Sequence, residues 1–331
     1  MTPRSRTFAL MLILAAAFST GWAQEPPEPG AAAYAERDFT IGEGDLALPG
    51  TLAMPDGEGP FPAVVLVHGS GPNDRDGTIG PNHPLRDIAH GLAERGVAVL
   101  RYDKRTRVHP IAFAFNKEAG VDEESTDDTM AAVAALQTTP GIDPGRVFVF
   151  GHSRGAMLTP RIVQRTAGAA GGIMLAASSR SMLDLLPEQV ERVGGIHGAD
   201  PAALAARLEA INDVIARLRA GEDASDATAI LGASAAYLRS ADALDPVADA
   251  RALQQPLLIL HGGHDIQVTD VDWQGWVDAF SNDPRVTLKR YPELGHLGIL
   301  ADPDRPMATY REPGVVDEGL IDDAAAWILS Q

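Results

Sequence analysis

The sequence predicts an α/β protein with a mostly parallel central sheet, and two observations carry this prediction. Five short runs are apolar on both faces: residues 63–67, 97–102, 147–150, 172–176 and 257–260. Strands of that kind are buried between helices in a parallel sheet. Stretches with helical spacing separate several of these runs, so the chain repeats the strand, helix, strand order of an α/β domain.

The remaining elements follow from local patterns. Residues 37–44 and 46–54 predict an antiparallel pair of strands at the start of the domain. Apolar residues one helical turn apart, such as Ile88 and Leu92, predict three helices. These helices cover residues 84–94, 126–137 and 154–166. A further strand is predicted over residues 286–291.

One segment, residues 181–250, interrupts the alternation because it contains no strand signal. Asp200 followed by Pro201 is a typical helix start, and an apolar helical face extends over residues 204–218. About 70 residues exceed a normal crossover connection. We therefore expect a helical cap over a pocket, with ordinary packing on the sheet as the alternative. The core is then in two parts, residues 37–180 and 251–331.

Residues 1–23 have the layout of a cleaved secretory signal. Arg4 and Arg6 precede an apolar run at residues 8–18, and small residues occupy the −3 and −1 positions of the cleavage site. The run is shorter than the roughly 20 apolar residues of a spanning helix. We therefore expect an exported protein, periplasmic or secreted, without stable membrane insertion after cleavage; an uncleaved anchor is the alternative. Residues 24–36 are expected to form a flexible lead-in.

Composition excludes several classes of protein. The 331 residues are 45% hydrophobic and carry a net charge of −18, which loss of Arg4 and Arg6 with the signal takes to −20. Such a chain buries a large core, and its charge disfavours nucleic acid and anionic lipid as partners. The chain has no cysteine. Disulfides, a thiolate nucleophile and cysteine-ligated metals are thereby excluded.

The most informative stretch is Gly-His-Ser-Arg-Gly at residues 151–155. It follows an apolar strand and precedes a helical pattern, which is the context of a nucleophile elbow. A Cβ at Gly151 or Gly155 would clash, because the sharp turn brings strand and helix backbones together. Ser153 is therefore the predicted nucleophile. The amide of Arg154, at the helix N-terminus, is one expected oxyanion donor.

A serine nucleophile needs a general base, and the base needs a carboxylate that orients it. In this kind of site the chain order is serine, acid, histidine. Asp265 follows the strand at residues 257–260, at the sheet edge where ligands bind in open α/β sheets, so it is the expected acid. His296 is the only histidine downstream of Asp265. It is therefore the expected base.

Other assignments of the polar side chains are open. Three further aspartates are alternative acids: Asp184, Asp270 and Asp272. His261 and His264 lie close to Asp265 in the sequence, as metal ligands could. Zinc catalysis requires ligands fixed from separate elements, and His261 is expected to point into the core. We therefore expect no metal and no other cofactor.

The second oxyanion donor is expected in the glycine-rich loop after the strand at residues 63–67. Gly69 and Gly71 allow this loop to turn so that the Ser70 N–H points at the reacting carbonyl. Together with His152, these two glycines are expected to contact the substrate.

Two charged clusters, at residues 74–76 and 101–105, lie at neighbouring strand ends. We interpret them first as salt-bridged supports of these loops and, as an alternative, as substrate contacts.

The motifs taken together resemble the α/β-hydrolase superfamily. They are His-Gly-Ser-Gly-Pro at 68–72, Asp-Arg-Asp at 74–76, Arg-Tyr-Asp-Lys-Arg at 101–105, the elbow at 151–155, and the segments of Asp265 and His296. More narrowly, they look like bacterial carboxylesterases of the dienelactone-hydrolase-like and serine-aminopeptidase-like group. Members of that group often have glycine where Thr106 stands here, and true dienelactone hydrolases use a cysteine that this chain lacks.

The resemblance implies an α/β-hydrolase fold with a helical cap and a serine esterase without a cofactor. It implies small-molecule esters, with small or short acyl groups, as substrates, cleaved through an acyl-enzyme. Two alternatives remain open. One is a peptidase or amidase that uses the same three residues; the other is a catalytically silent binding protein on this fold.

Overall fold

The computed structural model describes residues 33–331 of the chain. The predicted signal at residues 1–23 and most of the predicted lead-in lie outside the described residues. The first strand begins at Tyr34. Residues 34–36, expected in the lead-in, therefore belong to the sheet.

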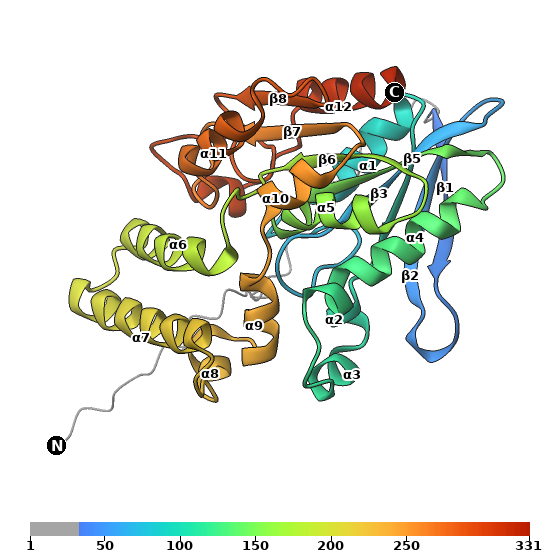
Figure 1. Ribbon diagram of the computed structural model, residues 1–331. Coiled ribbons are helices and arrows are strands. Elements are labelled where there is room, and N and C mark those ends of the chain that lie inside the picture. The colour runs from blue at the N-terminus through green and yellow to red at the C-terminus, as the bar shows by residue number, and fades with distance from the viewer. Residues whose placement is uncertain (1–32) are drawn as a thin grey trace, which may run out of the picture.

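The centre of the molecule is one sheet of eight strands (Figure 1). The strands are β1 (Tyr34–Ile41), β2 (Leu48–Pro55), β3 (Phe61–Val67), β4 (Ala98–Tyr102), β5 (Ile142–His152), β6 (Ala169–Leu175), β7 (Leu257–Gly262) and β8 (Val286–Tyr291). Their spatial order is β1-β2-β4-β3-β5-β6-β7-β8. Strands β3 to β8 run parallel, and β2 is antiparallel to both β1 and β4.

Helices cover both faces of the sheet. Residues 147–150 of β5 are fully buried and face the two sides in turn: Val147 and Val149 pack with one group of helices, Phe148 and Phe150 with the other. The first group includes α4 (Asp127–Gln137), α5 (Arg154–Arg165) and α11 (Asp270–Phe280). The second is α1 (Pro84–Glu94) and α12 (Glu318–Ser330). Because both faces are covered, the central strands are apolar on both sides, as the sequence predicts.

The segment between β6 and β7 is entirely helical, as expected. It contains α6 (Met182–Ile196), α7 (Pro201–Ala220), α8 (Ala227–Leu231), α9 (Ala235–Asp242) and α10 (Pro246–Ala252). Helices α6 to α9 share a small apolar core of their own and stand apart from the sheet at the lower left of Figure 1. Helix α10 packs against α5 instead. Within the predicted cap at residues 181–250, helices α6 to α9 are therefore the part with a core of its own.

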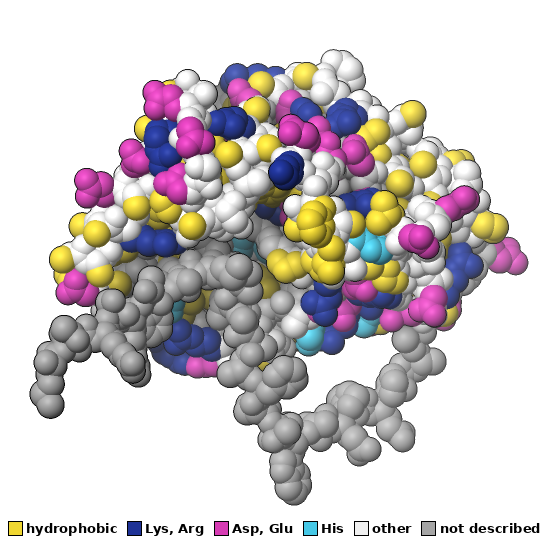
Figure 2. Space-filling view, turned by 90° about the horizontal axis from the view of Figure 1, so that it is seen from below, with side chains coloured by type: hydrophobic (Ala, Val, Ile, Leu, Met, Phe, Trp, Pro, Cys, Tyr) yellow, Lys and Arg dark blue, Asp and Glu magenta, His cyan; other side chains and the backbone are white. Residues whose placement is uncertain are grey.

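The short helices that precede α4 lie outside the predicted elements. They are α2 (Arg105–Val108), α3 (Pro110–Phe115) and a π-helix (Asp122–Thr126). Helices of four to six residues are too short to show a periodic apolar pattern. Figure 2 looks onto the face that carries α3, where Ile111 and Phe115 are exposed.

Candidate active site

The chain turns sharply at Ser153, between β5 and α5. Ser153 has a φ of 55°, a backbone conformation that non-glycine residues rarely adopt. A Cβ on Gly151 would lie 2.2 Å from the Gly155 carbonyl oxygen, and one on Gly155 would lie 2.4 Å from the Val67 carbonyl oxygen. Only glycine fits at either position, so the predicted nucleophile elbow is confirmed as a backbone structure.

The structure brings Ser153, His296 and Asp265 together from three separate loops. The distance from Ser153 Oγ to His296 Nε2 is 3.0 Å, and that from His296 Nδ1 to Asp265 Oδ2 is 2.8 Å. Ser153 and His296, which are 143 positions apart in the chain, are thus directly hydrogen-bonded. With Nδ1–H donating to the carboxylate, Nε2 is free to accept the Ser153 hydroxyl proton.

The Asp265 carboxylate is buried and fully hydrogen-bonded. Its second oxygen, Oδ1, accepts from the amides of Gln267 at 2.7 Å and Val268 at 2.9 Å. Burial alone would raise the pKa of Asp265, but the pairing with His296 and these two amides together lower it. The carboxylate therefore stays ionised and fixes the orientation of the imidazole.

The three alternative aspartates are engaged elsewhere. Asp272 is completely buried and accepts from Ser178 at 2.6 Å and from Arg180 at 3.0 Å. Asp184 pairs with Arg219 at 2.7 Å within the helical insertion, and Asp270 pairs with Arg290 at 2.9 Å. None of them contacts the His296 side chain.

His152, expected to contact the substrate, is a buried neighbour of His296. It is 5% exposed, and its Nε2–H donates to the His296 carbonyl oxygen at 2.9 Å. Burial, together with the adjacent His296, lowers the pKa of His152 to about 4. The ring is therefore neutral and supports the loop that carries His296.

The loop after β3 lies directly against Ser153. A Cβ on Gly69 would be 3.2 Å from the Ser153 Cβ, so the backbone approaches the elbow as closely as a glycine allows. Ser70 is exposed next to it, and the amide of Arg154 is the first of helix α5. Among residues 33–331 the Ser70 N–H has no hydrogen-bond acceptor, and an N-terminal helix amide has none within its helix. Both donors are available where the sequence expects an oxyanion hole.

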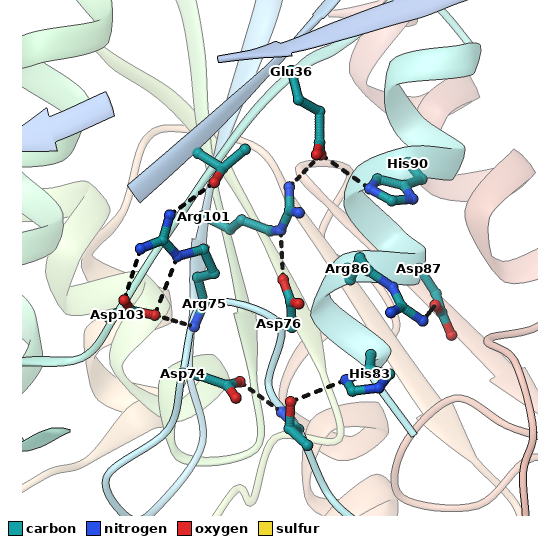
Figure 3. A network of polar contacts seen from close by, with 12 residues as sticks. Glu36, Asp74, Arg75, Asp76, His83, Arg86, Asp87, His90, Arg101 and Asp103 are labelled. Atoms are coloured by element: carbon teal, nitrogen blue, oxygen red, sulfur yellow. Dashed lines mark hydrogen bonds and ion pairs between the residues drawn. The ribbon is translucent and has the colours of Figure 1, made fainter. Parts of the chain in front are cut away.

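An ion network supports the outer part of this loop (Figure 3). We call Glu36, Arg75, Asp76, His90, Arg101 and Asp103 the outer network. Arg75 forms a two-pronged contact with Asp103, at 3.2 and 2.8 Å. Arg101 joins Asp76 at 2.9 Å to Glu36 at 2.6 Å. Arg75, Asp76, Arg101 and Asp103 therefore support the loop, as the first interpretation of the charged clusters holds.

A second group of charged side chains is buried on the inner side of the loop. We call Lys104, Glu124, Arg154 and Tyr237 the inner cluster; each is at most 7% exposed. Glu124 lies 3.2 Å from Lys104 Nζ and 2.6 Å from Arg154 Nη2. The Tyr237 hydroxyl, from cap helix α9, donates to Glu124 at 2.7 Å and accepts from the Arg154 guanidinium.

Sequence reasoning missed Glu124 and Tyr237 and assigned Lys104 only to a charged cluster. Glu124 lies in the π-helix, and Tyr237 lies more than 100 residues further along the chain. Nothing in the local pattern marks either as buried. A π-helix is often found at functional sites, but a segment of five residues leaves no recognisable signature in the sequence.

The two histidines near Asp265 are not arranged as metal ligands. His261 is buried, and its ring stacks on Trp273 with the centroids 5.5 Å apart. His264 Nδ1 lies 3.0 Å from the Ala301 carbonyl oxygen. Within residues 33–331, no three His, Asp or Glu side chains converge as a metal ion would require.

Comparison with known proteins identifies the family of the chain. A model of the alpha/beta hydrolase family matches residues 64–309, and the chain belongs to that family. Esterase EstD of Thermotoga maritima is 37% identical over 299 residues, which cover 89% of this chain and 68% of that protein.

Solved structures share the fold at low sequence identity. An esterase of Pyrococcus furiosus is 16% identical, with a TM-score of 0.58 over 90% of this chain and 92% of that one. A putative dipeptidyl aminopeptidase IV of Bacteroides ovatus is also 16% identical, with a TM-score of 0.59 over 93% of this chain and 37% of that one. In the described part of the chain, no helix has the length and apolar character needed to cross a bilayer.

Proposed function

We propose that this protein is a carboxylesterase that cleaves small-molecule esters through Ser153, His296 and Asp265. The observation that carries the proposal is the hydrogen-bonded chain of 3.0 and 2.8 Å from Ser153 Oγ to Asp265, at a strained elbow beside two available amides. The identity of 37% with an esterase supports ester bonds as the target.

In the first half-reaction, Ser153 Oγ attacks the ester carbonyl carbon while His296 Nε2 takes the hydroxyl proton. The carbonyl oxygen becomes an oxyanion that accepts from the amides of Ser70 and Arg154. The bond to the alcohol oxygen then breaks, and that oxygen takes the proton from Nε2. The products are the free alcohol and an acyl group on Ser153.

In the second half-reaction, water takes the place of the alcohol. His296 Nε2 removes a proton from the water as its oxygen attacks the acyl carbon, and the same two amides stabilise the second oxyanion. Collapse returns the proton to Ser153 Oγ and releases the carboxylic acid. Asp265 stays ionised throughout and stabilises the imidazolium formed in each step.

The decisive variant is Ser153→Ala, with Ser281→Ala as the control because Ser281 is an exposed serine away from the site. We expect hydrolysis of p-nitrophenyl acetate by S153A to fall by on the order of 10⁴-fold or more. Covalent labelling by a fluorophosphonate should disappear in S153A and persist in S281A. Full turnover by S153A would exclude the proposed nucleophile. A wild-type protein without turnover or labelling would favour a silent binding protein.

We propose small or short-acyl esters as the substrate class. A panel of p-nitrophenyl esters with acyl chains of two to twelve carbons, run beside aminoacyl anilides, tests this. We expect the highest kcat/KM at the short end of the ester series. A preference for the anilides would instead identify a peptidase or amidase.

We also propose that the protein is exported, from the signal-like pattern of residues 1–23. In cells that produce the full chain, mass spectrometry of the protein should find an N-terminus at Gln24, in the periplasm or medium. An intact N-terminus in the cytoplasmic fraction would overturn this proposal.

A further inference from the structure

Lys104 has no part in the proton transfers, yet it is buried next to the oxyanion loop. It lies two residues after the end of β4 and is 1% exposed, whereas the other two lysines of the chain, Lys117 and Lys289, are exposed. Its Nζ donates to the Gly69 carbonyl oxygen at 2.9 Å and lies 3.2 Å from Glu124. An ammonium group in this position contacts the loop from the side opposite to solvent.

The Gly69 carbonyl and the Ser70 N–H belong to the same peptide unit. A peptide is planar, and its C=O and N–H point in opposite directions. Any group that fixes the carbonyl therefore fixes the direction of the N–H. Lys104 Nζ and Asn73 Nδ2, the latter at 3.2 Å, both donate to the Gly69 oxygen. Donors on the carbonyl also polarise the peptide and strengthen the bond that its N–H can form.

The backbone of Lys104 also forms a hydrogen bond with this loop. The Lys104 amide donates to the Asn73 carbonyl oxygen at 3.1 Å. Asn73 Nδ2 in turn lies within hydrogen-bond distance of the carbonyl oxygens of Ser70 and Gly71, at 3.0 and 3.1 Å. The loop is thus fixed on its inner side by residue 104 and Asn73, independently of the outer network.

The charge of the inner cluster does not cancel. When Lys104 is protonated, it and Arg154 contribute two cations against the single carboxylate of Glu124. Burial, followed by the neighbouring Arg154 cation, lowers the pKa of Lys104 to about 7. Buried charge of this kind is weak evidence for stability. It does place positive potential beside the point where an oxyanion forms, in a chain whose net charge is −18.

We propose that Lys104 is a positioning residue for the oxyanion hole. Anchored by Glu124, its Nζ holds the Gly69–Ser70 peptide so that the Ser70 N–H points at the reacting carbonyl. This inference rests on the esterase function proposed above. It assigns to Lys104 an effect on the transition state, in which the oxyanion exists, and not on binding of the ground-state ester.

The test compares Lys104→Met, Lys104→Arg and the exposed control Lys117→Met in hydrolysis of p-nitrophenyl acetate. Removal of one oxyanion donor lowers kcat by roughly 10² to 10³-fold in other enzymes. We expect K104M to lower kcat by about 10 to 100-fold with KM within about two-fold. The Ki of a trifluoromethyl ketone, which forms an oxyanion on Ser153, should rise by the same factor. K104R should recover part of the loss, and K117M should match wild type.

A second variant keeps the test valid if K104M does not fold. Asn73→Ala removes the other donor to the Gly69 carbonyl from a half-buried loop position. It should lower kcat and raise the ketone Ki together, by about three to ten-fold, at unchanged KM. Folded K104M or N73A with wild-type kcat and Ki would overturn the positioning role, as would a change in KM alone. Absence of turnover in the wild type would instead reject the esterase function itself.

Discussion

The outer network and the inner cluster support two sides of the same loop with different physics. Arg75 and Asp103 of the outer network are about one-fifth exposed, so water screens the pair and the geometry matters more than the charge. Lys104 and Glu124 of the inner cluster are at most 5% exposed, and each depends on its partners for solvation. Charged residues that are neighbours in one short segment can therefore have different roles: some support a loop at the surface, and others lie buried beside the reaction centre.

The outer network and the inner cluster also connect different parts of the molecule. The outer network joins residues 75 and 76 to Asp103, to β4 and to the edge of the sheet at Glu36. The inner cluster joins the Gly69 peptide, the first residue of α5 and the cap helix α9. Loss of the outer network should therefore affect stability alone, whereas loss of the inner cluster should affect stability and catalysis together.

The largest expected effect comes from Glu124→Gln. This change leaves the Arg154 cation buried without a counter-charge, which should lower the free energy of unfolding by about 3 to 5 kcal/mol. Urea denaturation at pH 8 measures it, with Glu209→Gln on the exposed side of α7 as the control. A loss below about 1 kcal/mol would show that the cluster is solvated in some other way.

A smaller effect is expected when wild-type protein is acidified. Burial alone would raise the pKa of Glu124, but Arg154, Lys104 and Tyr237 lower it from 4.5 to about 2. The unfolded carboxyl therefore binds a proton at a higher pH than the folded one. Its contribution to stability is complete above pH 4.5 and is lost as the pH falls from 4.5 towards 2.

Melting temperatures measured across this range should fall more steeply for wild type than for E124Q, because the variant lacks the titrating carboxyl. Parallel curves for the two proteins would contradict the low pKa of Glu124.

Arg75→Ala should cost less than E124Q and act on stability only. It removes the contact with Asp103 and a hydrogen bond to Thr51 of 2.9 Å. We expect the free energy of unfolding to fall by about 1 to 2 kcal/mol, while kcat and the ketone Ki stay within about two-fold of wild type. A tenfold fall in kcat would remove the distinction between the outer network and the inner cluster.

The smallest effect is expected from Asp322→Asn, which removes an ion pair of 2.7 Å with Arg95. The Asp322 side chain is 65% exposed. The free energy of unfolding should change by less than about 1 kcal/mol, and by less still in 1 M salt, where screening acts over about 3 Å. A loss of stability as large as that of R75A would show that solvent exposure does not determine how much these two ion pairs contribute.

The fold was largely predictable because it depends on pattern. Apolar runs specify buried strands, and both α1 and β8 have the bounds that the sequence predicts. The unpredicted α2 and α3 are too short for periodicity to develop. That α10 packs against α5, apart from α6 to α9, is a tertiary contact that no local pattern encodes.

The candidate site was likewise predictable only in part. Ser153, Asp265 and His296 follow from a motif, a chain order and the position of one histidine, and the structure brings their side chains into contact. His152 shows the limit of this reasoning. Its place beside Ser153 in the sequence suggested a substrate contact, but residues of β5 alternate in direction, and its side chain is turned to the loop of His296.

The amino-acid sequence by itself determined the α/β architecture, the elbow and the three residues proposed to act in catalysis, because each depends on local pattern or chain order. Only the tertiary structure decided how the charges of residues 101–105 are divided. The side chains of Arg101 and Asp103 join the outer network, and that of Lys104 enters the interior. Whether a charge is screened or buried depends on what packs over it. Here that is a π-helix and a cap helix distant in sequence.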